Sequence, residues 1–188
     1  MTRLISLHNA VFSRIDSCTG LLGTTARFLF AAILLLYFWA SGLTKLGDGF
    51  FGLFSPSLGA YAQIFPRVME AVGYDASQLS IFHTLVVLAG TWAEFILPLL
   101  IVIGLLTRLS ALGMIGFVAV QTLTDLFGHG VKDEPATLGA WFDKIPESVI
   151  MDQRALWVFL LLVIVVRGAG PLSLDHLLTR RLAPQAHT

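Results

Sequence analysis

The residue in this chain with the clearest capacity for chemistry is Glu94, an acid in the middle of a long apolar segment. The segment runs from Ile81 to Leu106, and about 20 residues are enough to cross a bilayer as a helix. A carboxylate in the hydrocarbon core costs roughly 2.5 to 3.5 kcal/mol on insertion scales, so it normally faces a partner or a water-filled cavity. Glu94 is therefore a candidate for accepting or donating protons.

A second set of polar side chains lies near the end of a later apolar segment. Gln121, Asp125 and His129 are spaced i, i+4 and i+8, which places them on one helix face. His83 and Glu94 are eleven residues apart, nearly three helical turns, and also share a face. We expect both sets to lie in the same leaflet, although spacing alone does not show that the faces meet.

Structural and metal-binding readings of these residues both remain open. In the structural reading, Glu94 is protonated by burial and hydrogen-bonds a neighbouring helix. In the metal reading, His83, Asp125 and His129 bind copper or zinc, although no tight motif such as His-x-x-x-His is present. His83 and His129 also have roughly the matching depth for a haem.

A quinone-type or proton-linked site is the third reading. Such a site needs a flat apolar slot, polar groups for the quinone carbonyls and a route for protons. Glu94, Asp125 and His83 would supply the polar groups, and Trp92 or Trp39 would supply an aromatic wall.

Composition assigns the chain to the membrane. Of its 188 residues, 56% are hydrophobic and only 13% are charged, whereas a soluble domain has about 25% charged residues. The formal net charge is zero, which argues against nucleic acid as a partner. The sequence predicts an all-α membrane protein, a four-transmembrane-helix bundle with spans at about 21–43, 81–106, 109–127 and 151–167.

The segments outside the spans are expected to lie at the membrane interface. Residues 1–20 form an interfacial segment, 21–167 the four-helix membrane domain, and 168–188 a cytoplasmic amphipathic tail whose helix Ser173 can cap. Within the first long loop, 58–72 has the pattern of a broken helix lying on the membrane. The N-terminal apolar stripe consists of Leu4, Leu7, Val11 and Ile15.

Lysine and arginine near the span ends predict the orientation. Seven fall on the side of the termini: Arg3, Arg14, Arg27, Arg108, Arg167, Arg180 and Arg181. Five fall on the other side: Lys45, Arg67, Lys132, Lys144 and Arg154. The excess favours both termini in the cytoplasm, and Arg154 and Arg167, which bracket the fourth span, are expected to extend to the two interfaces.

The second and third spans are expected to pack as a tight hairpin. Small residues on both would permit close approach of the helices. They are Ala89, Gly90, Ala93, Gly113 and Gly116. Pro98 removes a backbone donor one turn after Glu94 and is expected to kink the second span.

Three stretches of the chain resemble the DoxX family of membrane proteins. They are FWASGLTKLGDG at 38–49, GLLTRLSAL at 104–112 and GAGPLSLDHLL at 168–178. The resemblance implies a four-helix bundle loosely associated with oxidoreductase chemistry, because the family is similar to the membrane subunit of a thiosulfate:quinone oxidoreductase. Some members lie in gene neighbourhoods for metal-stress peptides. Recurrent family positions match Arg27, Lys45, Glu94, Arg108 and Asp175.

We therefore expect a DoxX-type membrane subunit, redox-associated through quinone or an electron-transfer partner, with a proton-linked Glu94. The chain has one cysteine, Cys18, and no Cys-x-x-Cys, so a soluble or membrane redox partner is expected. The alternative is a non-enzymatic transporter or scaffold, in one version related to copper stress. Either way we expect a multi-pass protein of the bacterial inner membrane, in which homo-oligomers are possible.

The candidate site residues follow from these readings. Glu94 and Asp125 are the expected catalytic residues, and His83 and His129 are the candidate metal ligands. The expected cofactor-binding residues are Trp92, Gln121, Arg27, Lys45 and Trp39.

Overall fold

The computed structural model describes residues 2–17 and 19–182, and helices dominate this part of the chain. Within it there is no β-strand, only an isolated bridge between Leu46 and Pro56. Cys18 lies outside the described residues, and so do the side chains of Val11 and Ile15. What the sequence predicts for these three residues therefore falls outside the described part.

Four helical segments are long and apolar enough to cross a membrane, as the sequence predicts. The first combines α2 (Thr19–Phe30), a π-helical turn η1 (Ala31–Leu35) and α3 (Leu36–Leu43). The second is α6 (Ile81–Ile103), and the third is α7 (Thr107–Leu123) continued by the π-helical η3 (Thr124–His129). The fourth begins with the π-helical η5 (Val149–Arg154) and continues as α9 (Ala155–Arg167).

The turn between α6 and α7 lies earlier in the chain than the expected spans place it. Helix α6 ends at Ile103, three residues before the expected end at Leu106, because Gly104 adopts a left-handed conformation with φ of 72°. The Leu105 amide then donates to the Leu100 carbonyl, closing the helix end. Thr107 already begins α7, so the two helices must run antiparallel.

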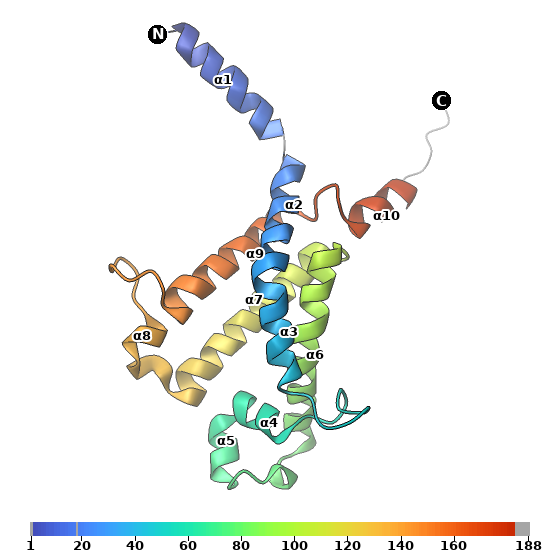
Figure 1. Cartoon of the computed structure of the whole chain (residues 1–188), viewed down its shortest axis with the longest axis vertical. Coiled ribbons are helices and arrows are strands. Elements are labelled where there is room, and N and C mark those ends of the chain that lie inside the picture. Colours follow the sequence, from blue (N-terminus) through green and yellow to red (C-terminus); the bar gives the residue numbers. More distant parts are fainter. Residues whose placement is uncertain (1, 18, 183–188) are drawn as a thin grey trace.

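The helices pack in the spatial order α3, α6, α7, α9 and α2, and α2 also contacts α6. Both α1 (Thr2–Ser17) and α10 (Leu174–Leu182) lie at the end of the bundle where α2 begins and α6 ends, which we call the terminal end (Figure 1). The opposite end carries both long loops, and we call it the loop end. The central core is a cluster of ten buried residues: Ala26, Phe30, Leu34, Phe38, Ile101, Ala111, Met114, Val118, Leu161 and Ile164.

Short helices cover the loop end. The expected broken helix is present as α4 (Leu58–Ile64) and α5 (Pro66–Ala71), separated at Phe65 because Pro66 starts a new helix as its first residue. Both pack on α6 through a second buried cluster: Ala60, Tyr61, Met69 and Val87. The remaining short elements are η2 (Ala76–Gln78), η4 (Val131–Asp133) and α8 (Pro135–Leu138).

Candidate functional site

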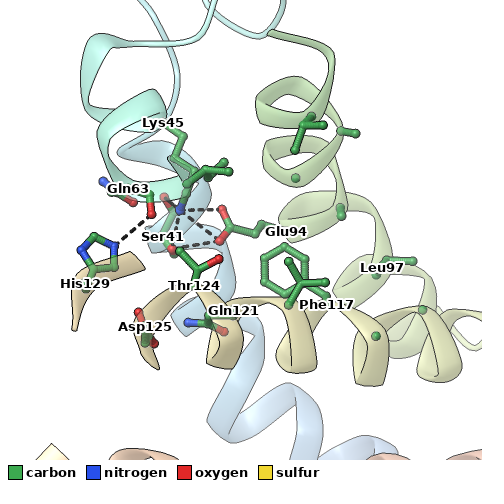
Figure 2. Close-up of a pocket in the computed structure, with 18 residues that line it drawn as sticks. Ser41, Lys45, Gln63, Glu94, Leu97, Phe117, Gln121, Thr124, Asp125 and His129 are labelled. Carbon is green, nitrogen blue, oxygen red and sulfur yellow. Dashed lines mark hydrogen bonds and ion pairs between the residues drawn. The ribbon is translucent and has the colours of Figure 1, made fainter. Parts of the chain in front are cut away.

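A groove of about 520 Å³ lies between α6 and α7 toward the loop end. Its α6 wall uses residues at helical spacing from Val86 to Leu97, and its α7 wall uses those from Gly113 to Gln121. The remaining lining comes from α3 and the turn after it, from α4, and from η3. Figure 2 shows the side chains of these elements converging on the same space.

Small residues create this groove. A methyl group added at Gly116 would meet nothing within 4 Å, and one at Gly90 would approach only Ile64, at 3.5 Å. Only Gly113 lies close to a side chain of α6, 3.2 Å from Leu97. Close approach of the two helices, which small residues are expected to permit, is therefore seen at Gly113. All five small residues also form the walls of a hollow: Ala89, Gly90, Ala93, Gly113 and Gly116.

The groove is open along its side and covered at one end. Ala89, Gly116 and Val120 line it and are exposed, so the opening runs along the surface between α6 and α7. Gln63 and Ile64 of α4 line the end toward the loops. This is the geometry of a site that a lipophilic molecule could enter from the bilayer.

A buried ion pair lies at the inner side of the groove. Lys45 Nζ is 3.0 Å from both carboxylate oxygens of Glu94. Ser41 Oγ donates to Glu94 Oε1 at 3.0 Å and accepts from Lys45 Nζ at 2.8 Å (Figure 2). The side chains of Lys45 and Glu94 are only 7% and 4% exposed, so water screens the pair little.

Close approach of α3 to α6 makes this cluster possible. A methyl group at Gly42 would lie 2.7 Å from Phe95 Cζ, so a side chain there would push the helices apart. Ser41 precedes Gly42, and Lys45 is one helical turn after Ser41 on the same face. Helix α3 ends at Leu43, and the long lysine side chain reaches back to the Ser41 carbonyl oxygen at 3.2 Å.

The face predicted from spacing on the third span does line the groove. Gln121, Asp125 and His129 are all part of its wall. His129 Nε2 lies 3.0 Å from the carbonyl oxygen of Gln63, which ties η3 to α4. Asp125 is ion-paired with Arg154.

Arg154 therefore has a role that its position in the sequence did not suggest. It is 5% exposed and buried within the protein, whereas the sequence predicts a side chain that extends outward. It also donates to Thr122 Oγ1 at 3.0 Å. Asp125 and Arg154 both belong to π-helical turns, η3 and η5, which are irregularities often found at functional sites.

Four predicted site residues do not line the groove, and three of them, Trp39, Trp92 and His83, lie near it in sequence or on the same helices. The Trp39 indole donates to the Phe95 carbonyl oxygen at 3.2 Å, and the Trp92 indole donates to that of Leu53 at 2.8 Å. His83 Nδ1 lies 2.9 Å from Ser80 Oγ. The two tryptophans thus hold helices and loop in place and do not form an aromatic wall of the groove.

The described part of the chain contains no group of three or more histidine, cysteine or acidic side chains that could hold a metal ion. His83 and His129 instead contact separate polar groups. The metal reading thus gains no support from these residues.

Arg27, predicted to bind a cofactor, lies at the terminal end of the bundle. Its guanidinium donates to the carbonyl oxygens of Ile101 and Val102 at the end of α6, and to those of Ala169 and Leu172 after α9. The bonds to Ile101 and Val102 are made at the end of α6, where a helix leaves carbonyls short of backbone donors. Arg27 is therefore a brace between three segments and not part of the groove.

Asp175 accepts hydrogen bonds from backbone amides at the start of α7, whereas Arg27 donates to backbone carbonyls. Its carboxylate accepts from the amides of Leu106 at 2.8 Å and Thr107 at 2.9 Å. Partial burial alone would raise the pKa of Asp175, but these bonds and the charge of Arg27 hold that pKa below its ordinary value. This contact fastens α10 to the turn between α6 and α7.

The family comparison agrees with this architecture. The DoxX family model matches residues 24–130, more than half of the chain, and the match includes Lys45, Glu94 and Asp125 but ends before Arg154. No curated protein and no solved structure matches the chain. The four membrane-length helices and the family match together show that this chain is a member of the DoxX family.

Proposed function

We propose that this protein binds a lipophilic molecule of the quinone class in the groove between α6 and α7, as a membrane subunit that works with a redox partner. The observation that carries the proposal is the Lys45–Glu94–Ser41 cluster, a buried polar group in a groove whose α6 and α7 walls are mostly apolar. Ligand sites commonly combine apolar walls with a few convergent polar groups.

The size and the opening of the groove support this ligand class. Its volume of about 520 Å³ is within the usual range for small-molecule sites, about 300 to 1,000 Å³. Ala89, Gly116 and Val120 along the opening leave room for a ring to enter sideways and for a tail to stay in the lipid. Such a ligand does not need a covalent bond to the protein.

The residues of the groove would hold and orient the head group. Glu94 Oε2 and Gln121 Oε1 are buried and accept no hydrogen bond from the described residues. A ligand with polar atoms on its ring would satisfy them, which is a fit between this ligand class and the groove. Electron transfer would be the chemistry of the ligand and its partner, and Glu94 would hold or move a proton at its carboxylate.

Filling the groove tests the proposal. Gly116→Leu adds a side chain where nothing lies within 4 Å, so we expect a folded protein with about tenfold or greater loss of affinity for a decyl-tailed benzoquinone. Ala119→Leu is the matched control, because Ala119 is exposed on the same helix but does not line the groove. Calorimetric titration of the purified protein in lipid nanodiscs measures both. Equal binding by wild type and Gly116→Leu would contradict the site, and absence of binding by wild type would contradict the function.

A further inference from the structure

The hydrogen-bonding pattern of the groove distinguishes between the two redox forms of the proposed ligand. A quinone has two carbonyl oxygens and only accepts hydrogen bonds. The reduced hydroquinone has two hydroxyl groups and also donates. Which form binds better depends on whether the groove offers donors or acceptors at its polar end.

The ion-paired cluster has no donor to spare. Lys45 has three ammonium hydrogens, and they are matched by three acceptors: Ser41 O, Ser41 Oγ and Glu94 Oε1. The hydroxyl hydrogen of Ser41 is also used, because Ser41 Oγ donates to Glu94 Oε1. A ligand carbonyl at this cluster would therefore have to displace a bond that already exists.

The same cluster leaves an acceptor unsatisfied. Glu94 Oε2 is buried and lies 3.0 Å from Lys45 Nζ, but it receives no well-directed hydrogen bond. Gln121 Oε1, on the opposite wall, is buried without a donor as well. Both side chains point toward the groove (Figure 2). Buried acceptors without donors are costly, and a ligand that brings donors removes this cost.

We infer that the groove binds the reduced, dihydroxy form of its ligand more tightly than the oxidised form, with a hydroxyl group donating to Glu94 Oε2 and another to Gln121 Oε1. This inference rests on the proposed function and adds the redox form to it. It makes the reduced carrier the form that occupies the protein when both forms are present at equal concentration.

Three probes with the same decyl tail test the inference under anaerobic conditions: the benzoquinone, its hydroquinone, and the dimethyl ether of that hydroquinone. The ether keeps the ring and the oxygens but has no hydroxyl hydrogens. We expect the hydroquinone to bind about tenfold more tightly than either of the others, the factor that one hydrogen bond to a charged acceptor supports. Equal or tighter binding of the quinone or the ether would overturn the inference and leave the proposed function intact. Failure of all three to bind would overturn both.

Two variants assign the preference to its residues. The double variant Lys45→Met with Glu94→Gln replaces the charged acceptor with a neutral amide, which donates as well as accepts, without leaving a buried lone charge. It should reduce the hydroquinone preference from about tenfold to about threefold. Gln121→Met should also reduce it about threefold, roughly one neutral hydrogen bond. Gln78→Met, in the exposed η2 turn, is the control and should keep the full preference. If the double variant does not fold, an unchanged preference in Gln121→Met still counts against the geometry.

Discussion

At the residue scale, the central feature is a charge pair that the sequence could not reveal. Glu94 was recognisable as an acid that needs a partner, because it interrupts an apolar run. Lys45 is 49 residues away and lies beyond the end of another helix. Pairing across that separation depends on how closely α3 and α6 approach, and the sequence signals this only through Gly42.

Separating this pair should be more harmful than removing it. Lys45→Met leaves Glu94 buried without its counter-charge, so we expect a loss of about 3 kcal/mol in unfolding free energy. Adding Glu94→Gln to the same variant should restore much of that loss, because neither charge then remains buried alone. Thermal unfolding in detergent measures both variants.

Lys132→Met is the control for this comparison, since Lys132 is exposed in a loop. It should leave the unfolding temperature unchanged. The ion pair is unimportant for stability if Lys45→Met unfolds at the same temperature as Lys132→Met, or if the double variant is less stable than the single one.

At the element scale, the spans were predictable and the irregular turns were not. Hydropathy located all four spans, and Pro66 marked the break between α4 and α5. The π-helical turns η3 and η5 were missed, because each depends on tertiary contacts such as the ion pair of Asp125 and Arg154. For the same reason, the sequence predicts an Arg154 side chain that extends outward, whereas it is buried.

The groove is also a product of how whole helices pack. Glycine and alanine on two helices are compatible either with tight packing or with a space between them. Packing of α4 against α6 and the contact of His129 with Gln63 favour the second outcome here. The sequence therefore indicated which residues lie between the helices but not that they enclose a hollow.

The contact of α10 with the turn between α6 and α7 should depend on pH. The pKa of Asp175 is below its ordinary value in the folded protein, so its stabilising effect is present above the ordinary aspartate range and is lost as the pH falls through that lowered pKa. Asp175→Asn should therefore be less stable than wild type near neutral pH, by about 1 kcal/mol, because the amide has one accepting oxygen instead of two and no charge. This difference should narrow at acidic pH.

Unfolding temperatures of wild type and Asp175→Asn, measured from pH 7 down to about pH 3, follow this difference. Asp133→Asn, in the exposed turn η4, is the control and should match wild type throughout. A difference between wild type and Asp175→Asn that widens on acidification would show that the carboxylate does not hold α10 in its charged form.

At the scale of the whole molecule, burial sharpens the argument for orientation. Of the five basic residues at the loop end, Lys45 and Arg154 are buried in ion pairs, which leaves Arg67, Lys132 and Lys144 in the loops. At the terminal end Arg27 is buried, and five of the described side chains are exposed: Arg3, Arg108, Arg167, Arg180 and Arg181. Five exposed basic residues against three is a larger ratio than seven against five, and it favours the cytoplasm for the terminal end.

Reporter fusions test this orientation in bacterial cells. A fluorescent protein fused after Thr188 should be fluorescent, and alkaline phosphatase inserted in the exposed loop after Lys144 should be active. The opposite pattern would place the loop end, and with it the groove, in the cytoplasmic half of the membrane. A redox partner would then approach the groove from the cytoplasm.

Photo-crosslinking of a quinone analogue tests the central claim most directly. An analogue with a photoreactive group on its ring is bound to purified protein in nanodiscs, irradiated, and mapped by mass spectrometry. We predict labelling within Ala89–Leu97 of α6 and Gly113–Gln121 of α7, both abolished by excess unlabelled ligand and by Gly116→Leu. Labelling confined to other segments, or labelling in these segments that excess ligand does not reduce, would contradict a quinone site beside Lys45 and Glu94.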